Sequence, residues 1–208
     1  TVCPDNCSEM FDNLMFLLNE PFESVYFSPA INLMKKEDYK VYISEIKKMA
    51  DYFINLIYSK QYDKACKIKN INSIVTRIHM GGIRKVHCGA ACNMIAADIN
   101  GQFYPCHRFV TNKECIVGSV EDGINMQTYD SFIENSLINN SPCRICWAVA
   151  LCGGGCPYEN YQETEYITVP NPLVCSVMKD IYVYIIEQYL LLPEEIIMDY
   201  FTSHCRES

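Results

Sequence analysis

The sequence predicts an α+β protein in which a strand–helix–strand opening and long packing helices precede a small cysteine-rich domain. Three observations support this prediction. Apolar residues recur at helical spacing in several stretches, an Asn-Gly step separates two strand-like runs, and most of the cysteines lie between residues 88 and 175. With 208 residues, half of them hydrophobic and a fifth charged, the chain is long enough to bury a core.

Composition excludes several classes of function. The formal net charge is -8 and no basic tract is present, which argues against a nucleic-acid partner. The most apolar run, residues 181–192, is interrupted by Glu187 and Gln188 and is too short to cross a bilayer, so we expect no membrane partner. Thirteen cysteines are an odd number, which disfavours a secreted disulfide scaffold. A reduced, cytoplasmic metal protein explains them better.

The opening of the chain has the pattern of one βα unit. Residues 1–3 have the character of a strand end, residues 5–18 combine N-cap types with apolar helical spacing, Pro21 stops the helix, and residues 24–28 form a short strand. Such units build parallel sheets and barrels. Two strands cannot bury both faces of a sheet, so we expect the chain to be the C-terminal part of a longer protein.

Two helices are predicted to follow this opening. A long one covers residues 37–58 and a second lies around residues 71–78, before the natural break at Gly81-Gly82. We place the end of the first domain at residue 82. The long helix is interpreted as a packing helix because one apolar stripe runs along it, formed by Tyr39, Ile43, Ile46, Met49, Ala50, Phe53, Ile54 and Ile57.

A β-hairpin is predicted next. Residues 94–99 and 102–104 flank Asn100-Gly101, the strongest short hairpin signal. Cys88 and Cys92 lie at the entrance of this hairpin and Cys106 lies at its exit. Since a hairpin returns its two ends to the same place, we expect these three sulfurs to converge.

The remaining elements are predicted from spacing. Residues 111–141 form a polar connection with a short helix near 126–138, and a helix over residues 173–192 carries Cys175 in its first turn. Residues 193–208 form a C-terminal tail with one more short helix at 194–201. The second domain is therefore expected to cover residues 83–192.

The densest motif lies between residues 143 and 156, where four cysteines follow the spacing Cys-x2-Cys-x5-Cys-x3-Cys. A two-residue gap lets one turn of chain place two sulfurs on one metal or cluster. Three glycines at 153–155 let the backbone pass tightly around a bulky group and point amide N–H groups at it. Soft thiolates at this density select zinc, copper(I) or iron–sulfur.

Eight cysteines of the two motif regions suffice for two four-cysteine sites. The other five, which are scattered, are interpreted as ordinary free thiols: Cys3, Cys7, Cys66, Cys115 and Cys205. The eight candidate ligands are Cys88, Cys92, Cys106, Cys143, Cys146, Cys152, Cys156 and Cys175.

The full pattern resembles a known family. Cys88, Gly101 and Cys106 give Cys-x12-Gly-x4-Cys, which is followed by the 143–156 motif and by Cys175. This resembles the SPASM domain, the C-terminal two-cluster extension of many radical S-adenosylmethionine (SAM) enzymes. The resemblance covers roughly residues 86–190. Residues 1–58 look like the last part of the partial βα barrel that precedes SPASM in such enzymes.

The resemblance implies two [4Fe–4S] clusters. It assigns Cys88, Cys106 and Cys156 to the first cluster, with Cys92 at the hairpin mouth as the natural fourth ligand. Some relatives lack a cysteine at this fourth position, so the presence of Cys92 implies a fully ligated first cluster. The second cluster is assigned to Cys143, Cys146, Cys152 and Cys175.

Radical SAM chemistry itself is not expected from this chain. It needs a Cys-x3-Cys-x2-Cys loop, and Cys88-x3-Cys92 is followed by Ile95 where the third cysteine would be required. SAM and a third [4Fe–4S] cluster would therefore belong to the missing N-terminal half of the parent enzyme. Whether the chain alone is an enzyme stays open, and so does a catalytically silent relative.

The resemblance also bears on the substrate, which would be a peptide or protein. In the sulfatase-maturing branch an aspartate follows the cysteine after Gly-x4, whereas His107 and Arg108 stand here. This is more similar to maturases that install thioether or other cross-links in ribosomally made peptides (RiPPs). Either residue would face the substrate or hydrogen-bond to cluster sulfurs and backbone. The alternatives are an anaerobic sulfatase maturase and a zinc-binding protein-interaction module, although only Cys143 and Cys146 form a zinc-type Cys-x2-Cys pair.

Overall fold

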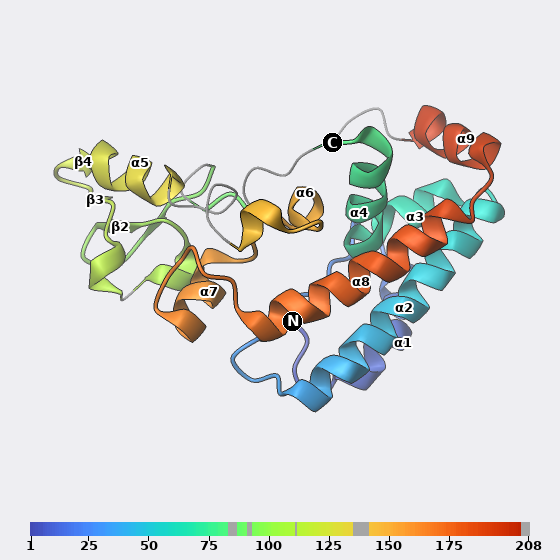
Figure 1. Ribbon diagram of the computed structural model, residues 1–208, viewed down its shortest axis with the longest axis horizontal. Helices are drawn as coiled ribbons and strands as arrows, with labels where there is room; N and C mark the ends of the chain where they lie inside the picture. The colour runs from blue at the N-terminus through green and yellow to red at the C-terminus, as the bar shows by residue number, and fades with distance from the viewer. Residues whose placement is uncertain (83–86, 91–92, 111, 135–141, 205–208) are drawn as a thin grey trace. The chain divides into compact units, whose positions relative to one another are not determined.

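The computed structural model describes residues 1–82, 87–90, 93–110, 112–134 and 142–204. These residues form a mostly helical α+β protein with one four-stranded sheet (Figure 1). The predicted α+β class is confirmed, whereas the barrel fragment and the two-cluster domain stay predictions. None of the described helices is long and apolar enough to cross a membrane.

The chain divides into two compact units. The helical unit comprises residues 1–82 and 176–208, and the cysteine-rich unit comprises residues 83–175. The predicted domains changed at 82/83 and 192/193, and the compact units change at 82/83 and 175/176. Most of the last long helix, α8 (Pro172–Leu190), therefore belongs to the helical unit.

The N-terminal segments that were predicted as strands form parallel pairs, but only through single bridges. A 3-10 helix, η1 (Cys7–Glu9), leads into α1 (Met10–Leu17), as the helical spacing predicted. The predicted strands are reduced to parallel bridges of Val2 with Pro29 and of Val25 with Ile68. Backbone bonds support the first bridge, with Val2 N–H 2.9 Å from the Ser28 oxygen. A pair without further neighbouring strands is marginal, which explains why no longer ladder forms among these residues.

Helix α2 (Lys36–Tyr58) is the packing helix of the helical unit. Every residue of its predicted apolar stripe is buried except Ile43 and Ile54, which are half-buried. The carboxylate of Glu45, a residue only 3% exposed, reaches from α2 to α1 and accepts the Phe11 N–H at 2.9 Å. Lys48 pairs with the same carboxylate at 2.5 Å. The helix prediction is confirmed. The structure also shows that Glu45 is buried, which the apolar stripe did not reveal.

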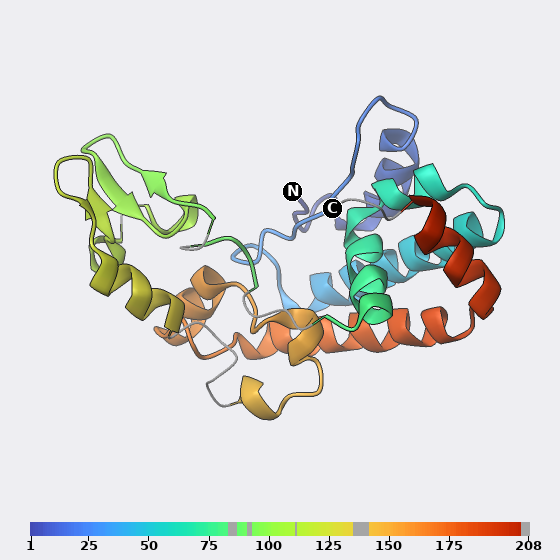
Figure 2. The ribbon, with the colours of Figure 1, turned by 90° about the horizontal axis from the view of Figure 1, so that it is seen from above.

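Helices α3 (Tyr62–Lys67) and α4 (Lys69–Met80) follow α2, and α4 ends at the left-handed Gly81. The part of α8 after Cys175 runs alongside α2 in both ribbon views (Figure 2). Tyr184 on α8 donates a hydrogen bond to Asp51 of α2, and Lys47 lies 4.8 Å from the centroid of the Tyr184 ring. These contacts attach the second half of α8 to the helical unit.

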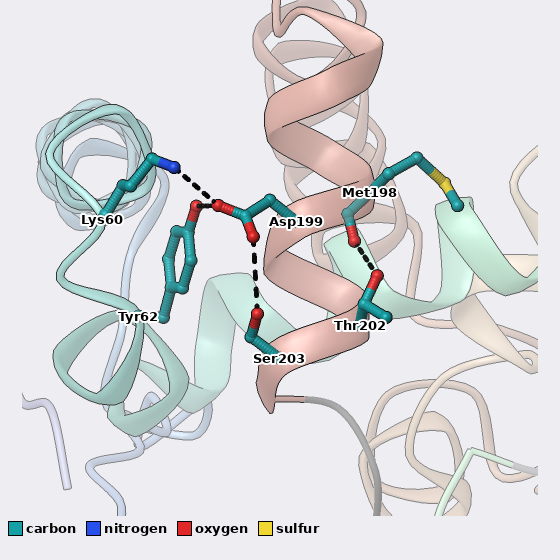
Figure 3. Close-up of polar contacts among 6 residues, drawn as sticks. All are labelled: Lys60, Tyr62, Met198, Asp199, Thr202 and Ser203. Carbon is teal, nitrogen blue, oxygen red and sulfur yellow. Dashed lines mark hydrogen bonds and ion pairs between the residues drawn. The ribbon is translucent and has the colours of Figure 1, made fainter.

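The predicted C-terminal tail contains a well-packed helix, α9 (Glu194–His204). Figure 3 shows how it is held: the Asp199 carboxylate accepts hydrogen bonds from Lys60 and Tyr62 and lies near Ser203. Thr202 in the same helix bonds back to the Met198 carbonyl. Tyr200 packs edge-on against Tyr62 with ring centroids 5.4 Å apart.

Replacing Tyr200 by phenylalanine should lower the free energy of unfolding by about 1 kcal/mol, the usual net value of one hydrogen bond. Tyr200 is 1% exposed, and its hydroxyl donates to Asn72 Oδ1 at 2.8 Å and lies 3.3 Å from Cys66 Sγ. Urea unfolding followed by circular dichroism would measure the change. Tyr26→Phe is the control because Tyr26 is 65% exposed. Equal unfolding midpoints for the two variants would contradict the prediction.

The cysteine-rich unit contains the sheet, in the antiparallel order β1 (Ala96–Ala97), β2 (Gln102–Tyr104), β3 (Gly118–Ser119) and β4 (Gly123–Ile124). The predicted hairpin is confirmed: Ala96 pairs with Tyr104, and Gly101 adopts φ 76° in the turn. Asp98 closes this turn, since its Oδ1 accepts the backbone N–H groups of Asn100 and Gln102.

The cysteine-rich unit also contains several short helices. They include the predicted helix near residues 126–138, which is confirmed as α5 over Met126–Glu134, while residues 135–138 lie outside the described residues. The others are η2 (His107–Phe109), η3 (Lys113–Cys115), η4 (Cys143–Ile145), α6 (Val149–Cys152) and α7 (Pro157–Thr164).

Candidate metal centre

The predicted ligands lie within the cysteine-rich unit, in different degrees of burial. Cys106 and Cys143 are each 7% exposed, and Cys88 is exposed. Cys92 lies outside the described residues. The half-buried ligands are Cys146, Cys152, Cys156 and Cys175.

The segments at the entrance and at the exit of the hairpin both contribute to one buried cluster. Ala90, Tyr104, Cys106 and Phe109 form this cluster, which we call the Phe109 cluster. Ala90 lies between Cys88 and Cys92 in sequence, so it brings the entrance segment to Cys106. In the entrance segment, the Asn93 N–H donates a hydrogen bond to the Gly89 carbonyl at 2.8 Å. The convergence of the sulfurs of Cys88, Cys92 and Cys106 stays a prediction, because Cys92 lies outside the described residues.

Helix α7 packs on the Phe109 cluster and brings Cys156 with it. Cys156 is the N-cap residue of α7, and Pro157 occupies the first helical position. The ring of Tyr158 meets that of Phe109 edge-on, with centroids 5.3 Å apart. Two cysteines assigned to the first cluster, Cys106 and Cys156, therefore lie on elements that pack directly against each other.

Arg108 links these two elements. Its Nη1 lies 3.5 Å from Cys156 Sγ and pairs with Glu159 Oε1, while its guanidinium carbon lies 4.6 Å from the centroid of the Tyr158 ring. The sequence left two roles open for His107 and Arg108. In the structure, Arg108 contacts the Cys156 sulfur and the Glu159 carboxylate, whereas His107 is exposed. Glu159 was not singled out from the sequence.

Burial governs the chemistry of this sulfur. Desolvation, followed by the negative charge of Glu159, raises the pKa of Cys156 to about 11, although backbone N–H groups and Arg108 act against the shift. Burial likewise raises the pKa of Glu159 above its usual range, and Arg108 opposes that shift. The Cys156 thiol is thus protonated near neutral pH, so a metal that binds it must displace a proton.

The segments of chain that carry the second predicted site include η4, the end of α6 and the glycine loop that follows it. Cys143 lies in η4, and the Cys146 N–H donates to its carbonyl at 3.0 Å. Cys152 ends α6, and its carbonyl lies 3.0 Å from His87 Nδ1, which ties it to the residue before Cys88. All three following glycines are left-handed, at φ 67°, 92° and 83° for Gly153, Gly154 and Gly155. Glycine is needed there because residues with a Cβ rarely adopt such φ values.

Asn160 holds the glycine loop against the start of α8. It is 2% exposed, and its Nδ2 donates to the carbonyls of Gly154 at 3.2 Å and Ile167 at 3.1 Å. Its Oδ1 accepts the Asn171 N–H at 3.0 Å. Asn171 in turn caps α8 by accepting the N–H of Leu173 and Val174. The first turn of α8, with Cys175, is thereby connected to the loop between Cys152 and Cys156.

Sequence reasoning missed Asn160, and only weak signals pointed to its surroundings. Asn171-Pro172 is an N-cap type followed by proline at a helix start, which does predict where α8 begins. Nothing in the polar run after Cys156 distinguishes a buried asparagine from an exposed one. Its hydrogen bonds depend on tertiary contacts that spacing alone does not reveal.

A ninth sulfur lies at the edge of the Phe109 cluster. Cys115 packs against this cluster, and its pKa is raised to about 11 by burial and by the charges of Glu114 and Cys106. The sequence interpretation made it an ordinary free thiol, and the structure adds that it neighbours Cys106.

The donor set fits a thiolate-bound cluster in kind and in number, but the structure does not gather those ligands that it describes. Among the described residues, no three His, Cys, Asp or Glu side chains lie in a group that could hold a metal ion. The structure links Cys106 with Cys156 by packing, and Cys152 with the Cys88 segment by a hydrogen bond. Assembly of closed four-sulfur sites stays a prediction.

Comparison with protein-family models gives no match for this chain, and a search of curated proteins gives none either. The proposal for its function therefore rests on the cysteine spacing and on the geometry of the cysteine-rich unit.

Proposed function

We propose that this chain is the auxiliary-cluster portion of a radical SAM enzyme that modifies a peptide or protein. The supporting observation is the spacing of eight cysteines, seven of which, with Gly101, follow the two-cluster pattern. The contact of the Cys106 and Cys156 segments through Phe109 and Tyr158 is consistent with a shared first site.

In this proposal each residue has a defined task. Cys88, Cys92, Cys106 and Cys156 bind one [4Fe–4S] cluster, and Cys143, Cys146, Cys152 and Cys175 bind the other. Such clusters, when bound, accept and donate single electrons. Within the chain, the Phe109 cluster excludes water from the Cys106 side, and Arg108 donates a hydrogen bond to the Cys156 sulfur.

The substrate is proposed to be a ribosomally made peptide, and the parent enzyme a maturase that forms thioether or other cross-links. His107 follows the buried Cys106 directly and is exposed, so its imidazole is accessible to a peptide. A neutral imidazole has one ring nitrogen without a proton, and that nitrogen can accept one from a substrate. Arg108 is not proposed to bind the peptide carboxylate, since it already pairs with Glu159.

Metal analysis of the chain after anaerobic purification and reconstitution tests this function. We expect about eight irons and eight sulfides per chain, four of each in every [4Fe–4S] cluster, together with brown colour. We also expect no 5′-deoxyadenosine from SAM under reducing conditions, because the Cys-x3-Cys-x2-Cys loop is missing. Stoichiometric zinc in native protein would instead support the protein-interaction module, and iron for one cluster only would contradict the eight-ligand assignment.

A further inference from the structure

We infer that Arg108 is a positioning residue that raises the reduction potential of the cluster bound through Cys156, and that the negative charge of Glu159 partly cancels this effect. This inference rests on the proposed function. The inference goes beyond the proposed function, because cysteine spacing assigns the eight ligands only. Arg108 and Glu159 are not ligands, but they act on the ligand Cys156.

The guanidinium of Arg108 is fixed by three contacts. Its Nη1 lies 3.5 Å from Cys156 Sγ and bonds to Glu159 Oε1, and its guanidinium carbon lies 4.6 Å from the centroid of the Tyr158 ring. The two charged side chains are largely removed from solvent, with exposed fractions of 30% for Arg108 and 10% for Glu159. Arginine suits this place because its planar fork can bond two acceptors and stack on a ring at once.

The three contacts come from elements that the fold already holds together. Arg108 lies in η2 directly after Cys106, and Tyr158 and Glu159 lie in the first turn of α7 directly after Cys156. Phe109 packs against Tyr158, which fixes η2 on α7. The donor is therefore positioned before any cluster binds.

The sign of the effect follows from electrostatics. A hydrogen bond and a positive charge at a ligand sulfur stabilise the more negative, reduced cluster and raise its reduction potential. Glu159 partly cancels that charge, and the cancellation is strong because the pair is little exposed. Removal of Arg108 should thus lower the potential, and neutralisation of Glu159 should raise it.

Redox titration of the reconstituted chain, followed by electron paramagnetic resonance, tests the inference. At a fixed potential near the wild-type midpoint, Arg108→Met should lower the reduced-to-oxidised ratio of one cluster about tenfold, which corresponds to about 59 mV for one electron. Glu159→Gln, which keeps the size and the hydrogen bond of the side chain, should shift the same cluster in the opposite direction. The other cluster should be unchanged in both variants.

Lys113→Met is the matched control, because it also removes one positive charge from the cysteine-rich unit, but at an exposed position in η3, which carries none of the assigned ligands. It should change either ratio less than twofold. Shifts in the same direction for Arg108→Met and Glu159→Gln, or unchanged potentials with both clusters bound, would overturn the inference alone. If Arg108→Met fails to hold the first cluster, the Glu159→Gln shift decides. Wild-type protein that takes up no iron would overturn the proposed function, and this inference with it.

Discussion

Replacing Cys146 by alanine is expected to reduce the iron content of the reconstituted chain from about eight to about four atoms, since a [4Fe–4S] cluster takes four cysteine ligands. Cys146 follows η4 and shares a backbone hydrogen bond with Cys143, so both sulfurs come from one turn of chain. Removal of the Cys146 sulfur therefore leaves the second cluster with three of its four proposed ligands. Because binding of a metal centre and local folding are coupled, the same variant should also unfold more easily than wild type when loaded.

Iron analysis and urea unfolding of the loaded proteins would measure both effects. Cys115→Ala is the control, because Cys115 lies in the same unit and neighbours Cys106 but is assigned to neither site. It should keep the full iron content. If Cys115→Ala halved the iron while Cys146→Ala kept it, the assignment of eight ligands would be wrong, and the sulfur at the edge of the Phe109 cluster would have to replace one of them.

The helices were predictable because their signal is local. The apolar stripe of residues 39–57 repeats with the period of a helix, and the structure buries that face of α2. The Asn100-Gly101 turn likewise fixed the hairpin, since its φ requirement is met within a few residues. The opening strands were harder to predict, because a strand needs a neighbour and the sequence does not show whether one is present.

The unit to which a helix belongs could not be predicted from its own sequence. Helix α8 is one continuous apolar helix, and its pattern gives no reason to divide it at Cys175. The division follows from contacts far apart in sequence, such as Tyr184 with Asp51. Residues 193–208 were predicted as a tail because the packing contacts of α9 are also with residues far away in sequence. In the structure, Tyr200 of α9 is buried against Tyr62.

For the candidate site, spacing located the sulfurs but not the groups that act on them. Cysteine is chemically distinctive, and a Cys-x2-Cys-x5-Cys-x3-Cys run has few explanations. Arg108, Glu159 and Asn160 are common residue types whose roles arise when η2, α7 and the glycine loop pack together. His107 and Arg108 were singled out only because they follow Cys106, and the structure separated them by exposure.

The largest effect on stability is expected for Asn160→Leu. Leucine has nearly the same size, but it leaves the Gly154 and Ile167 carbonyls and the Asn171 N–H without their side-chain partner in a buried place. Each unsatisfied buried group costs about 1–3 kcal/mol, so the free energy of unfolding of the cysteine-rich unit should fall by about 3 kcal/mol. Because Asn160 Oδ1 would lie only 3.4 Å from a Cβ on Gly155, the loop has little room to find new partners.

Trp147 is the only tryptophan of the chain and lies in the cysteine-rich unit, so its fluorescence during urea unfolding reports on that unit. Gln162→Leu is the matched control, because it makes the same type of change in the same helix at an exposed position. Its effect should stay within about 0.5 kcal/mol, as for other surface substitutions. If Asn160→Leu unfolded at the same urea concentration as Gln162→Leu, the hydrogen bonds of Asn160 could not be what holds the glycine loop to the start of α8.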